Sequence, residues 1–451
     1  MPGHPTAPGT GLQADDRPSV ATEADAPTPV PLVEPRDGVP AAVDTPAGLR
    51  RTVDIFAAGS GPVAVDAERA SGYRYGQRAY LVQLRRAGAG TALIDPVGCP
   101  DLSELGAAIA DAEWVLHAAS QDLPCLAELG MRPTTIFDTE LAGRLAGHAR
   151  VGLAAMVETV LGFTLEKGHS AADWSTRPLP EPWLRYAALD VELLIELRDA
   201  LATELEWQGK LAWAQEEFAA VVASPPPLPR LEPWRRTSGI HRLRTRRQLA
   251  GVRALWEARD ALARRRDIAP GRILPDSAVI AAVVAAPASP AALVALPVFG
   301  GRSNRRMVDV WYGALAAAAA LPESALPAAA AALGDGPPPA NRWADRDPQA
   351  AARLVRLRMA VGALAEQHRL PVENLLQPDL VRRLAWTPPQ VVQSEQVGAA
   401  LSAGGARDWQ VALTAGSLTE ALLAPDAVDA GHSVSPVDSA EAVSASGPAD
   451  G

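Results

Sequence analysis

The stretch Pro62–Leu84, PVAVDAERASGYRYGQRAYLVQL, decides the fold, because two strand-like runs flank a polar segment that contains glycine. Val63–Asp66 and Ala79–Leu84 have the composition of β-strands. Side chains two residues apart on a strand share a face, so Asp66 and Glu68 should project together. Two adjacent carboxylates repel each other and are typical of a cation site, although a solvated strand end would show the same pattern.

Further strands are predicted at Ala92–Ile94 and Trp114–His117. Three closely spaced strands are expected before the first helix, so the opening should be an antiparallel meander. Helices that follow such a meander favour a mixed sheet with helices packed on it. The helical patterns lie at Asp101–Ala110, Leu123–Leu129, Leu153–Leu161 and Pro182–Leu205.

Composition divides the chain into one mixed α/β block and two helical blocks. Residues 1–47 (the acidic N-terminal tail) and 424–451 lack an apolar period and are predicted to be disordered. The predicted blocks are 48–222 for the α/β domain, 223–234 for a Pro-rich linker, and 235–322 and 340–423 for the helical domains.

The two helical blocks are predicted to be a degenerate repeat. Each contains a helix, a turn with proline, and an Ile-Leu or Leu-Leu pair that leads into another helix. Chance similarity between two segments rich in Ala and Leu is the alternative. At an offset of 102 residues, Leu255, Leu262, Ala263, Ile268, Ile273, Leu274 and Val279 correspond to Leu357, Leu364, Ala365, Leu370, Leu375, Leu376 and Val381.

Charge and cysteine content favour a cytoplasmic protein with a local basic surface. The net charge is −10, yet Arg230–Arg272 contains 13 arginines against 4 acidic residues, so a local basic surface is expected. No apolar run has the length and flanks of a membrane span or a secretory signal. Cys99 and Cys125 are too few for a disulfide framework or a Cys-based zinc site, which favours the reducing cytoplasm.

Two further elements carry acidic residues. In Glu113–Gly130, EWVLHAASQDLPCLAELG, a strand-like run leads to Asp122 in the first turn of a predicted helix. In Trp183–Leu201, WLRYAALDVELLIELRDAL, Tyr186 and Asp190 are four residues apart and share a helix face. Each element alone has an ordinary explanation, since acidic residues are common near helix N-termini and Tyr/Asp pairs are common on helix surfaces.

In this order and spacing, the three elements resemble the DEDD superfamily of 3′–5′ exonucleases, in the subgroup with Tyr in the third motif. The ribonuclease D family is the most similar. FDT at Phe137–Thr139 and DWSTRPL at Asp173–Leu179 add to the resemblance. It covers roughly residues 50–400 and implies a ribonuclease H-like mixed-sheet nuclease domain followed by two all-α HRDC-like domains (helicase and ribonuclease D C-terminal). Ala67 departs from the family, which often has a hydroxyl residue there, and this leaves substrate preference in doubt.

The resemblance implies metal-dependent hydrolysis of nucleic acid from the 3′ end, releasing nucleoside 5′-monophosphates. Two divalent ions, Mg²⁺ or Mn²⁺, suit oxygen ligands and phosphodiester cleavage. Asp66 should bridge the ions. Tyr186 is expected to orient the attacking water, because a phenol with a pKa of about 10 is a poor base at neutral pH. The implied metal ligands are Asp66, Glu68, Asp122 and Asp190.

RNA contacts are predicted in two regions, a loop before the tyrosine helix and the arginine-rich region. An exposed loop could carry Lys167, Trp174 and Arg177 to the scissile end. The arginine-rich region could bind phosphates, or it could be only a solvated helix face. The candidates there are Arg244, Arg247 and, after a Gly-Gly turn, Arg305. His117 and Asp138 are expected in supporting roles, with a helix N-cap equally open for Asp138.

The expected substrate is the 3′ end of RNA, with tRNA precursors foremost. A DNA 3′–5′ exonuclease is the second hypothesis, because no donor to a 2′-hydroxyl can be identified in the sequence. The absence of a Walker-type phosphate loop disfavours it. The third hypothesis, a non-catalytic RNA-binding adaptor, is disfavoured by the complete set of carboxylates. No membrane partner is expected.

Overall fold

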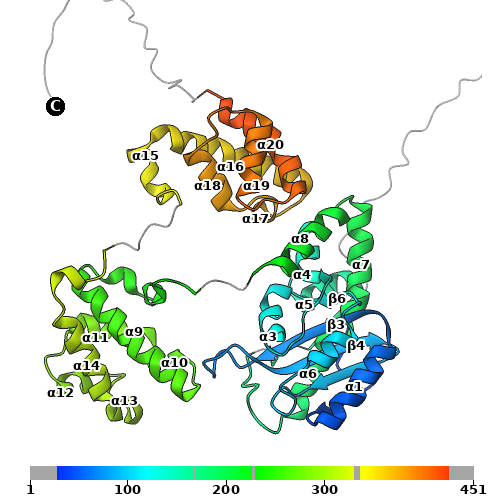
Figure 1. The fold of residues 1–451 in the computed structure, drawn as a ribbon, viewed down its shortest axis with the longest axis horizontal. Coiled ribbons are helices and arrows are strands. Elements are labelled where there is room, and N and C mark those ends of the chain that lie inside the picture. The colour runs from blue at the N-terminus through cyan, green and yellow to red at the C-terminus, as the bar shows by residue number, and fades with distance from the viewer. Residues whose placement is uncertain (1–27, 167, 170, 226–228, 330–335, 426–451) are drawn as a thin grey trace, which may run out of the picture.

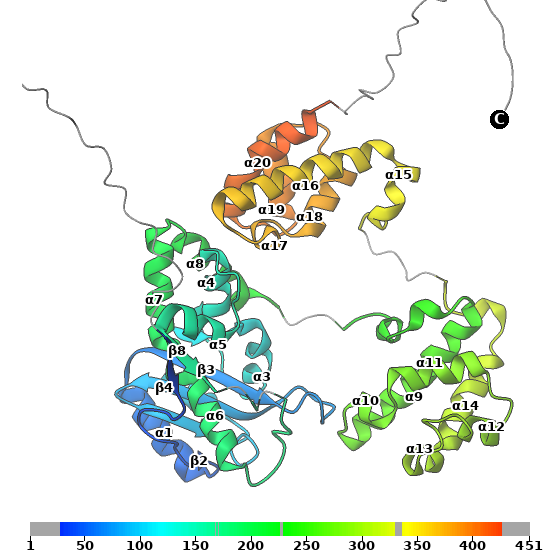
Figure 2. The ribbon, with the colours of Figure 1, turned by 180° about the vertical axis from the view of Figure 1, so that it is seen from behind.

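The computed structural model describes residues 28–166, 168–169, 171–225, 229–329 and 336–425. A mixed α/β domain is followed by two helical bodies (Figure 1). The reverse view in Figure 2 shows the same three parts. Within the described ranges, no helix is both long and apolar enough to cross a membrane.

A six-stranded mixed sheet forms the centre of the α/β domain, with the strand order β2-β5-β4-β3-β6-β7. β3, β4 and β5 form the antiparallel meander that the sequence predicts, whereas β6 and β7 continue from β3 as parallel strands and β2 pairs parallel to β5. The mixed sheet is therefore confirmed. The strands are β2 (Ala42–Val43), β3 (Ser60–Arg69), β4 (Ala79–Ala87), β5 (Gly90–Ile94), β6 (Trp114–Leu116) and β7 (Ile136–Asp138).

The prediction of disorder up to residue 47 is wrong for residues 28–47. β1 (Val30–Leu32) pairs with β8 (Phe163–Leu165), β2 joins the main sheet, and helix α1 (Pro46–Ala58) precedes β3. Strands of two or three residues are held by backbone hydrogen bonds to partners distant in sequence, so they leave no apolar period to detect. Residues 1–27 and 426–451, also predicted to be disordered, lie outside the described residues.

Helices cover both faces of the sheet. Val63, Val65 and Val82 belong to the large core on one face. On the other face, Leu81 and Leu93 pack against Ala187 and Ala188 of helix α6. The helices of this domain are α1, α2 (Ser103–Ala108), α3 (Leu123–Glu128), α4 (Thr139–Ala146), α5 (Leu153–Met156), the π-helical turn η3 (Val157–Leu161), α6 (Glu181–Glu192), α7 (Leu194–Trp207) and α8 (Leu211–Ala223).

The two helical bodies repeat the same three helices at the predicted offset of 102 residues. α9 (Arg246–Arg266), α10 (Pro270–Ile273) and α11 (Asp276–Ala285) correspond to α16 (Pro348–His368), α17 (Val372–Leu375) and α18 (Pro378–Trp386). α9 and α16 both end at a residue with left-handed backbone, Asp267 (φ 49°) and Arg369 (φ 52°). The remaining helices are α12 (Pro290–Val294), α13 (Arg302–Arg306), α14 (Val308–Ala319), α15 (Trp343–Arg346), α19 (Ser394–Ala403) and α20 (Asp408–Leu423).

Both helical bodies contact the α/β domain. Trp409 of α20 stacks on Trp213 of α8, with ring centroids 5.1 Å apart. The first body begins earlier than predicted, because Trp234, assigned to the linker, is buried in its core. A single tryptophan beside prolines gives no helical period, so composition placed the boundary too late.

Candidate active site

Strand β3 positions the first two carboxylates. Asp66 lies opposite Gln83 of β4, and Glu68 lies opposite Leu81, in the antiparallel register. Because side chains alternate along the strand, Asp66 and Glu68 share the sheet face that carries Leu81. That is the face covered by α6. Val65 and Ala67, which alternate with these carboxylates, are buried in the core on the opposite face, and this pattern fixes the register.

Helix α6 brings Tyr186 and Asp190 over the same face. Ala187, Ala188 and Val191 are buried, and these short side chains allow the helix to lie close to the sheet. Tyr186 and Asp190 lie one helical turn apart on the same face of α6. Carboxylate oxygens of Asp66, Glu68 and Asp190 all lie within 4.8 Å of one another. Residues more than 100 positions apart in sequence thus converge at one point.

Asp122 approaches from the end of β6. It precedes α3 directly, but its side chain makes no capping hydrogen bond. Its Oδ1 instead lies 3.4 Å from Arg69 Nη2. The turn before it begins at Ala118, which has a left-handed backbone (φ 61°). Asp122 is therefore turned away from the helix-capping role and toward β3.

Asp138 holds that turn. Its carboxylate accepts hydrogen bonds from the backbone nitrogens of Ala118 at 3.0 Å and Ala119 at 2.8 Å. The same carboxylate caps α4 by accepting from the nitrogens of Glu140 and Leu141. Asp138 is therefore the N-cap of α4, which is one of the two roles that the sequence left open for it. Asp138 also fixes the chain that carries Asp122.

Burial makes this cluster costly without cations. Burial, followed by the charges of Asp66 and Asp190, raises the pKa of Glu68 to about 10. Burial, followed by the charge of Asp66, raises the pKa of Asp122 to about 8. The pKa values of Asp66 and Asp190 are also raised, mainly by burial. Four carboxylates beside a single arginine supply only hard oxygen ligands, a donor set that fits Mg²⁺ or Mn²⁺.

The side chains of Tyr186 and His117 stay uncharged. Burial and the neighbouring Asp190 raise the pKa of Tyr186 well above its usual value, so the phenol keeps its proton. Burial lowers the pKa of His117 to about 4. The Nδ1 of His117 lies 2.9 Å from Thr139 Oγ1 at the start of α4. His117 is therefore an uncharged imidazole tied to the scaffold.

Comparison with known proteins decides the family. Residues 40–206 match the family model of a 3′–5′ exonuclease, residues 248–315 the HRDC domain, and residues 336–422 the 3′ to 5′ exonuclease C-terminal domain. Ribonuclease D of Acidiphilium cryptum (strain JF-5) is 33% identical over 318 residues, which are 67% of this chain and 78% of that protein. This chain belongs to the ribonuclease D family. It is a 3′–5′ exoribonuclease, a hydrolase that binds nucleic acid, and it carries an acidic cluster, as expected for a family that depends on divalent metal.

Solved structures of similar proteins extend over nearly the whole chain. A protein from Bifidobacterium adolescentis is 42% identical with a TM-score of 0.79, and the match covers 87% of this chain and 99% of that one. Ribonuclease D of Escherichia coli, described as an exoribonuclease involved in structured RNA processing, is 27% identical with a TM-score of 0.61, over 85% and 98%. The ribonuclease D fold therefore includes both helical bodies.

One predicted RNA contact, Trp174, is wrong, and a second, Arg177, is already paired within the protein, so its contact with RNA stays a prediction. Trp174 is fully buried, with its ring 5.4 Å from Trp183 and 6.5 Å from Tyr186. Arg177 binds Asp95 through two hydrogen bonds of 2.6 and 2.7 Å and also donates to the Tyr80 carbonyl. The sequence predicts an exposed loop for the segment that carries both residues, because that segment has no apolar period. It instead packs behind the tyrosine helix.

The other predicted contacts divide into three groups. Arg247 donates to the carbonyl of Ala319 and to Glu323, so it holds the end of α14, and a phosphate contact by its half-exposed side chain stays a prediction. Arg244 and Arg305 are exposed, and a phosphate contact by either stays a prediction. Lys167 lies outside the described residues.

Two residues of the site were missed. Arg69 follows the first motif directly and pairs with Asp122, so a basic residue next to Glu68 was the available signal. Gln83 is fully buried opposite Asp66, and its amide has no hydrogen-bond partner among the described residues. Only the register of β4 reveals that Gln83 shares the face of the carboxylates.

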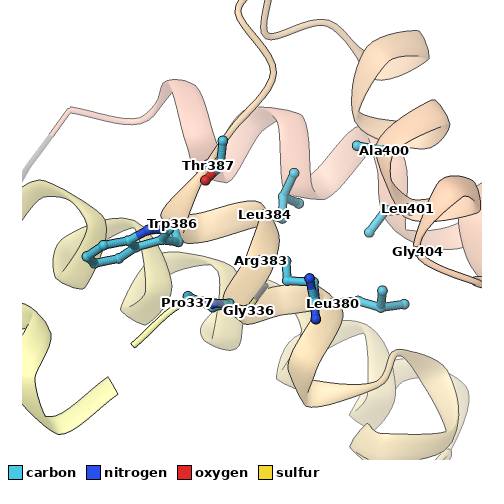
Figure 3. Close-up of a pocket in the computed structure, with 10 residues that line it drawn as sticks. All are labelled: Gly336, Pro337, Leu380, Arg383, Leu384, Trp386, Thr387, Ala400, Leu401 and Gly404. Atoms are coloured by element: carbon cyan, nitrogen blue, oxygen red, sulfur yellow. The ribbon is translucent and has the colours of Figure 1, made fainter. Parts of the chain in front are cut away.

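A cavity in the C-terminal body is unrelated to these carboxylates. It has a volume of about 370 Å³ and lies between α18, α19 and the chain at Gly336 and Pro337 (Figure 3). Leu384, Leu401 and Arg383 line it, and none of its lining residues is acidic. A smaller cavity of about 200 Å³ includes Glu68 and Arg69 and therefore belongs to the active site.

Proposed function

We propose that this exoribonuclease trims the 3′ ends of structured RNAs, tRNA precursors among them, with two divalent ions, Mg²⁺ or Mn²⁺. The convergence of acidic side chains from β3, the β6–α3 turn and α6 on one sheet face carries the proposal. The description of the Escherichia coli relative as a processor of structured RNA supports the substrate class. The residues proposed to hold the ions are Asp66, Glu68, Asp122 and Asp190.

Each residue has a distinct part in hydrolysis. A bound divalent ion supplies a water of lowered pKa and charge that neutralises the phosphate. The charge of Asp66 acts on Glu68, Asp122 and Asp190, and this place among the other carboxylates suits a ligand shared by both ions. Glu68 and Asp190 belong to the same group of carboxylates as Asp66, and Asp122 adds a fourth carboxylate from the turn before α3.

Tyr186 holds the attacking water in line with the scissile phosphate. Its phenol keeps its proton, because burial and Asp190 raise its pKa. Asp190 lies one helical turn away on the same face of α6, so its carboxylate directs the hydroxyl before substrate arrives. A fixed hydroxyl contributes by orientation, because a correctly placed nucleophile avoids the entropic cost of a chance encounter. The released product is a nucleoside 5′-monophosphate.

The exposed arginines Arg244 and Arg305 supply phosphate contacts outside the catalytic cluster. Such contacts increase affinity for any strand and carry no sequence information. We place the activity in the cytoplasm, where Cys99 and Cys125, both free and buried, stay reduced.

The substrate class is tested with three 5′-labelled strands: an RNA hairpin with a single-stranded 3′ extension, the same extension alone, and the DNA equivalent of the hairpin. We expect the RNA extension to be shortened stepwise up to the base of the hairpin. Faster loss of the DNA extension would favour the DNA exonuclease. Binding of RNA with no shortening of any strand would favour the adaptor.

A further inference from the structure

The loop between β3 and β4, residues 70–78, is bound on its outer side by the first helical body. The backbone nitrogen of Ala269 donates to the Tyr73 carbonyl at 2.9 Å. Arg272 Nε donates to the Gly72 carbonyl at 2.7 Å, and its guanidinium lies 3.8 Å from the centre of the Tyr73 ring. Both views show this loop extending from the sheet toward α10 (Figures 1 and 2).

Tyr75 makes the most extensive of these contacts. Its hydroxyl donates to Asp260 Oδ1 at 3.0 Å and accepts from Arg264 Nη2 at 3.1 Å. Its backbone nitrogen donates to Asp267 Oδ1 at 3.3 Å. Asp267 is the left-handed residue that ends α9, so the end of this long helix is shaped to receive the loop.

The inner side of the same loop faces the catalytic cluster. Ser71, Gly72 and Tyr73 line the cavity of about 200 Å³ that includes Glu68 and Arg69. Gly72 therefore contributes to the active-site cavity while its carbonyl is held by the helical body.

The loop is also tied to the segment that packs behind Tyr186. Arg74 Nε donates to Ser175 Oγ at 2.8 Å, beside the buried Trp174. Arg74 Nη1 also lies 3.9 Å from Asp267 Oδ2. One arginine thus joins the end of α9 to the surroundings of the catalytic tyrosine.

We propose that the first helical body is a positioning element of the active site, which acts through the 70–78 loop with Tyr75 as its principal contact. The inference rests on the proposed function. A nine-residue loop that links two strands is ordered at an entropic cost, and contacts on its outer side offset that cost. Displacement of an active-site wall by about 1 Å can slow a reaction by about a hundredfold, so docking of the loop affects the chemical step.

This role differs from substrate binding, which the sequence predicted for the same arginine-rich region. Arg264 and Arg272 belong to that region, yet both donate to the loop of the nuclease domain. A body that only binds RNA would affect affinity for long strands. A body that positions the loop would affect the turnover of substrates too short to reach it.

The test compares the full-length variants Tyr75→Phe and Asp267→Ala with wild type. Tyr312→Phe is the matched control, because the Tyr312 hydroxyl donates to the Ala288 carbonyl within the same helical body. The measurements are the single-turnover rate on an RNA dinucleotide, the Kd for a long RNA in EDTA, and hydrogen exchange of residues 70–78. We expect faster loop exchange and a dinucleotide rate lowered about tenfold, with Kd unchanged.

An unchanged dinucleotide rate in both variants would overturn the proposal, whether or not loop exchange changes. A raised Kd with an unchanged rate would also overturn it and would assign this body to RNA binding. A wild-type protein that cleaves neither the dinucleotide nor the long RNA would instead contradict the proposed function itself. The two failures are therefore distinguishable.

Discussion

Arg69 Nη2 lies 3.4 Å from Asp122 Oδ1, at the edge of the carboxylate cluster. The Arg69 side chain is 25% exposed and that of Asp122 is 7% exposed, so little water screens the pair. Arg69 also opposes the rise that burial causes in the pKa values of Asp66 and Glu68. An arginine in this place partly neutralises the cluster and competes with divalent cations for it.

Removal of that arginine should strengthen metal binding. We expect Arg69→Ala to bind Mn²⁺ about tenfold more tightly than wild type, which corresponds to about 1.4 kcal/mol. Calorimetric titration with Mn²⁺ measures the change. Arg78→Ala serves as the control, because Arg78 ends the loop that follows Arg69 but lies over the Tyr80 ring. Weaker Mn²⁺ binding in Arg69→Ala than in Arg78→Ala would contradict the assigned competition.

Metal binding should also depend on pH. The pKa of Glu68 is raised from 4.5 to about 10, so between these values the folded state holds a proton that the unfolded state has lost. The stability contributed by that proton is present below about pH 4.5 and is lost as pH rises toward 10. Since a metal ion must displace the proton, affinity for Mg²⁺ should rise with pH. Calorimetry in buffers of different ionisation enthalpy counts the released protons, and zero release in wild type would refute this account.

Loss of the tyrosine hydroxyl should slow chemistry without loosening RNA. Tyr186→Phe removes the hydroxyl that is proposed to orient the attacking water and leaves the ring in place. We expect the single-turnover rate to fall about a hundredfold, as for the misplacement of a reacting group, with little change in RNA affinity. Quench-flow on a labelled RNA measures the rate. A Tyr186→Phe protein with the full rate would remove Tyr186 from the mechanism.

Arg177 should prove to be a structural residue. Its two hydrogen bonds to Asp95 are largely buried, and truncation would leave that carboxylate unpaired. We expect Arg177→Ala to lower the free energy of unfolding by about 3 kcal/mol. The Kd for RNA should stay the same at temperatures where the variant is folded. Denaturant unfolding and RNA titration separate the two effects, and a large rise in Kd at unchanged stability would support the predicted RNA contact.

Local pattern predicted those parts of the site that depend on a single element. The strand period placed Asp66 and Glu68 on one face, and the helix period did the same for Tyr186 and Asp190. The offset of 102 residues also reappears helix by helix, because each helical body is built from regular apolar periods. Family resemblance added Asp122, whose side chain reaches the cluster only through the turn held by Asp138.

Features that depend on tertiary contacts could not be predicted in this way. The short strand β1 is defined by its distant partner β8, and nothing in three residues identifies it. Trp174 and Arg177 appeared exposed because burial by another element leaves no mark on an irregular segment. The arginines of α9 have the composition of a phosphate-binding surface, and only the folded chain shows that Arg264 binds Tyr75.

The measurement that tests the central claim most directly is degradation of 5′-labelled single-stranded RNA with Mg²⁺, Mn²⁺ or EDTA, by wild type and Asp66→Asn. The account predicts a ladder that shortens from the 3′ end with either metal, is absent in EDTA, and is reduced at least about a hundredfold in the variant, which lacks the shared ligand. Equal ladders from wild type and Asp66→Asn, or a ladder that persists in EDTA, would contradict it.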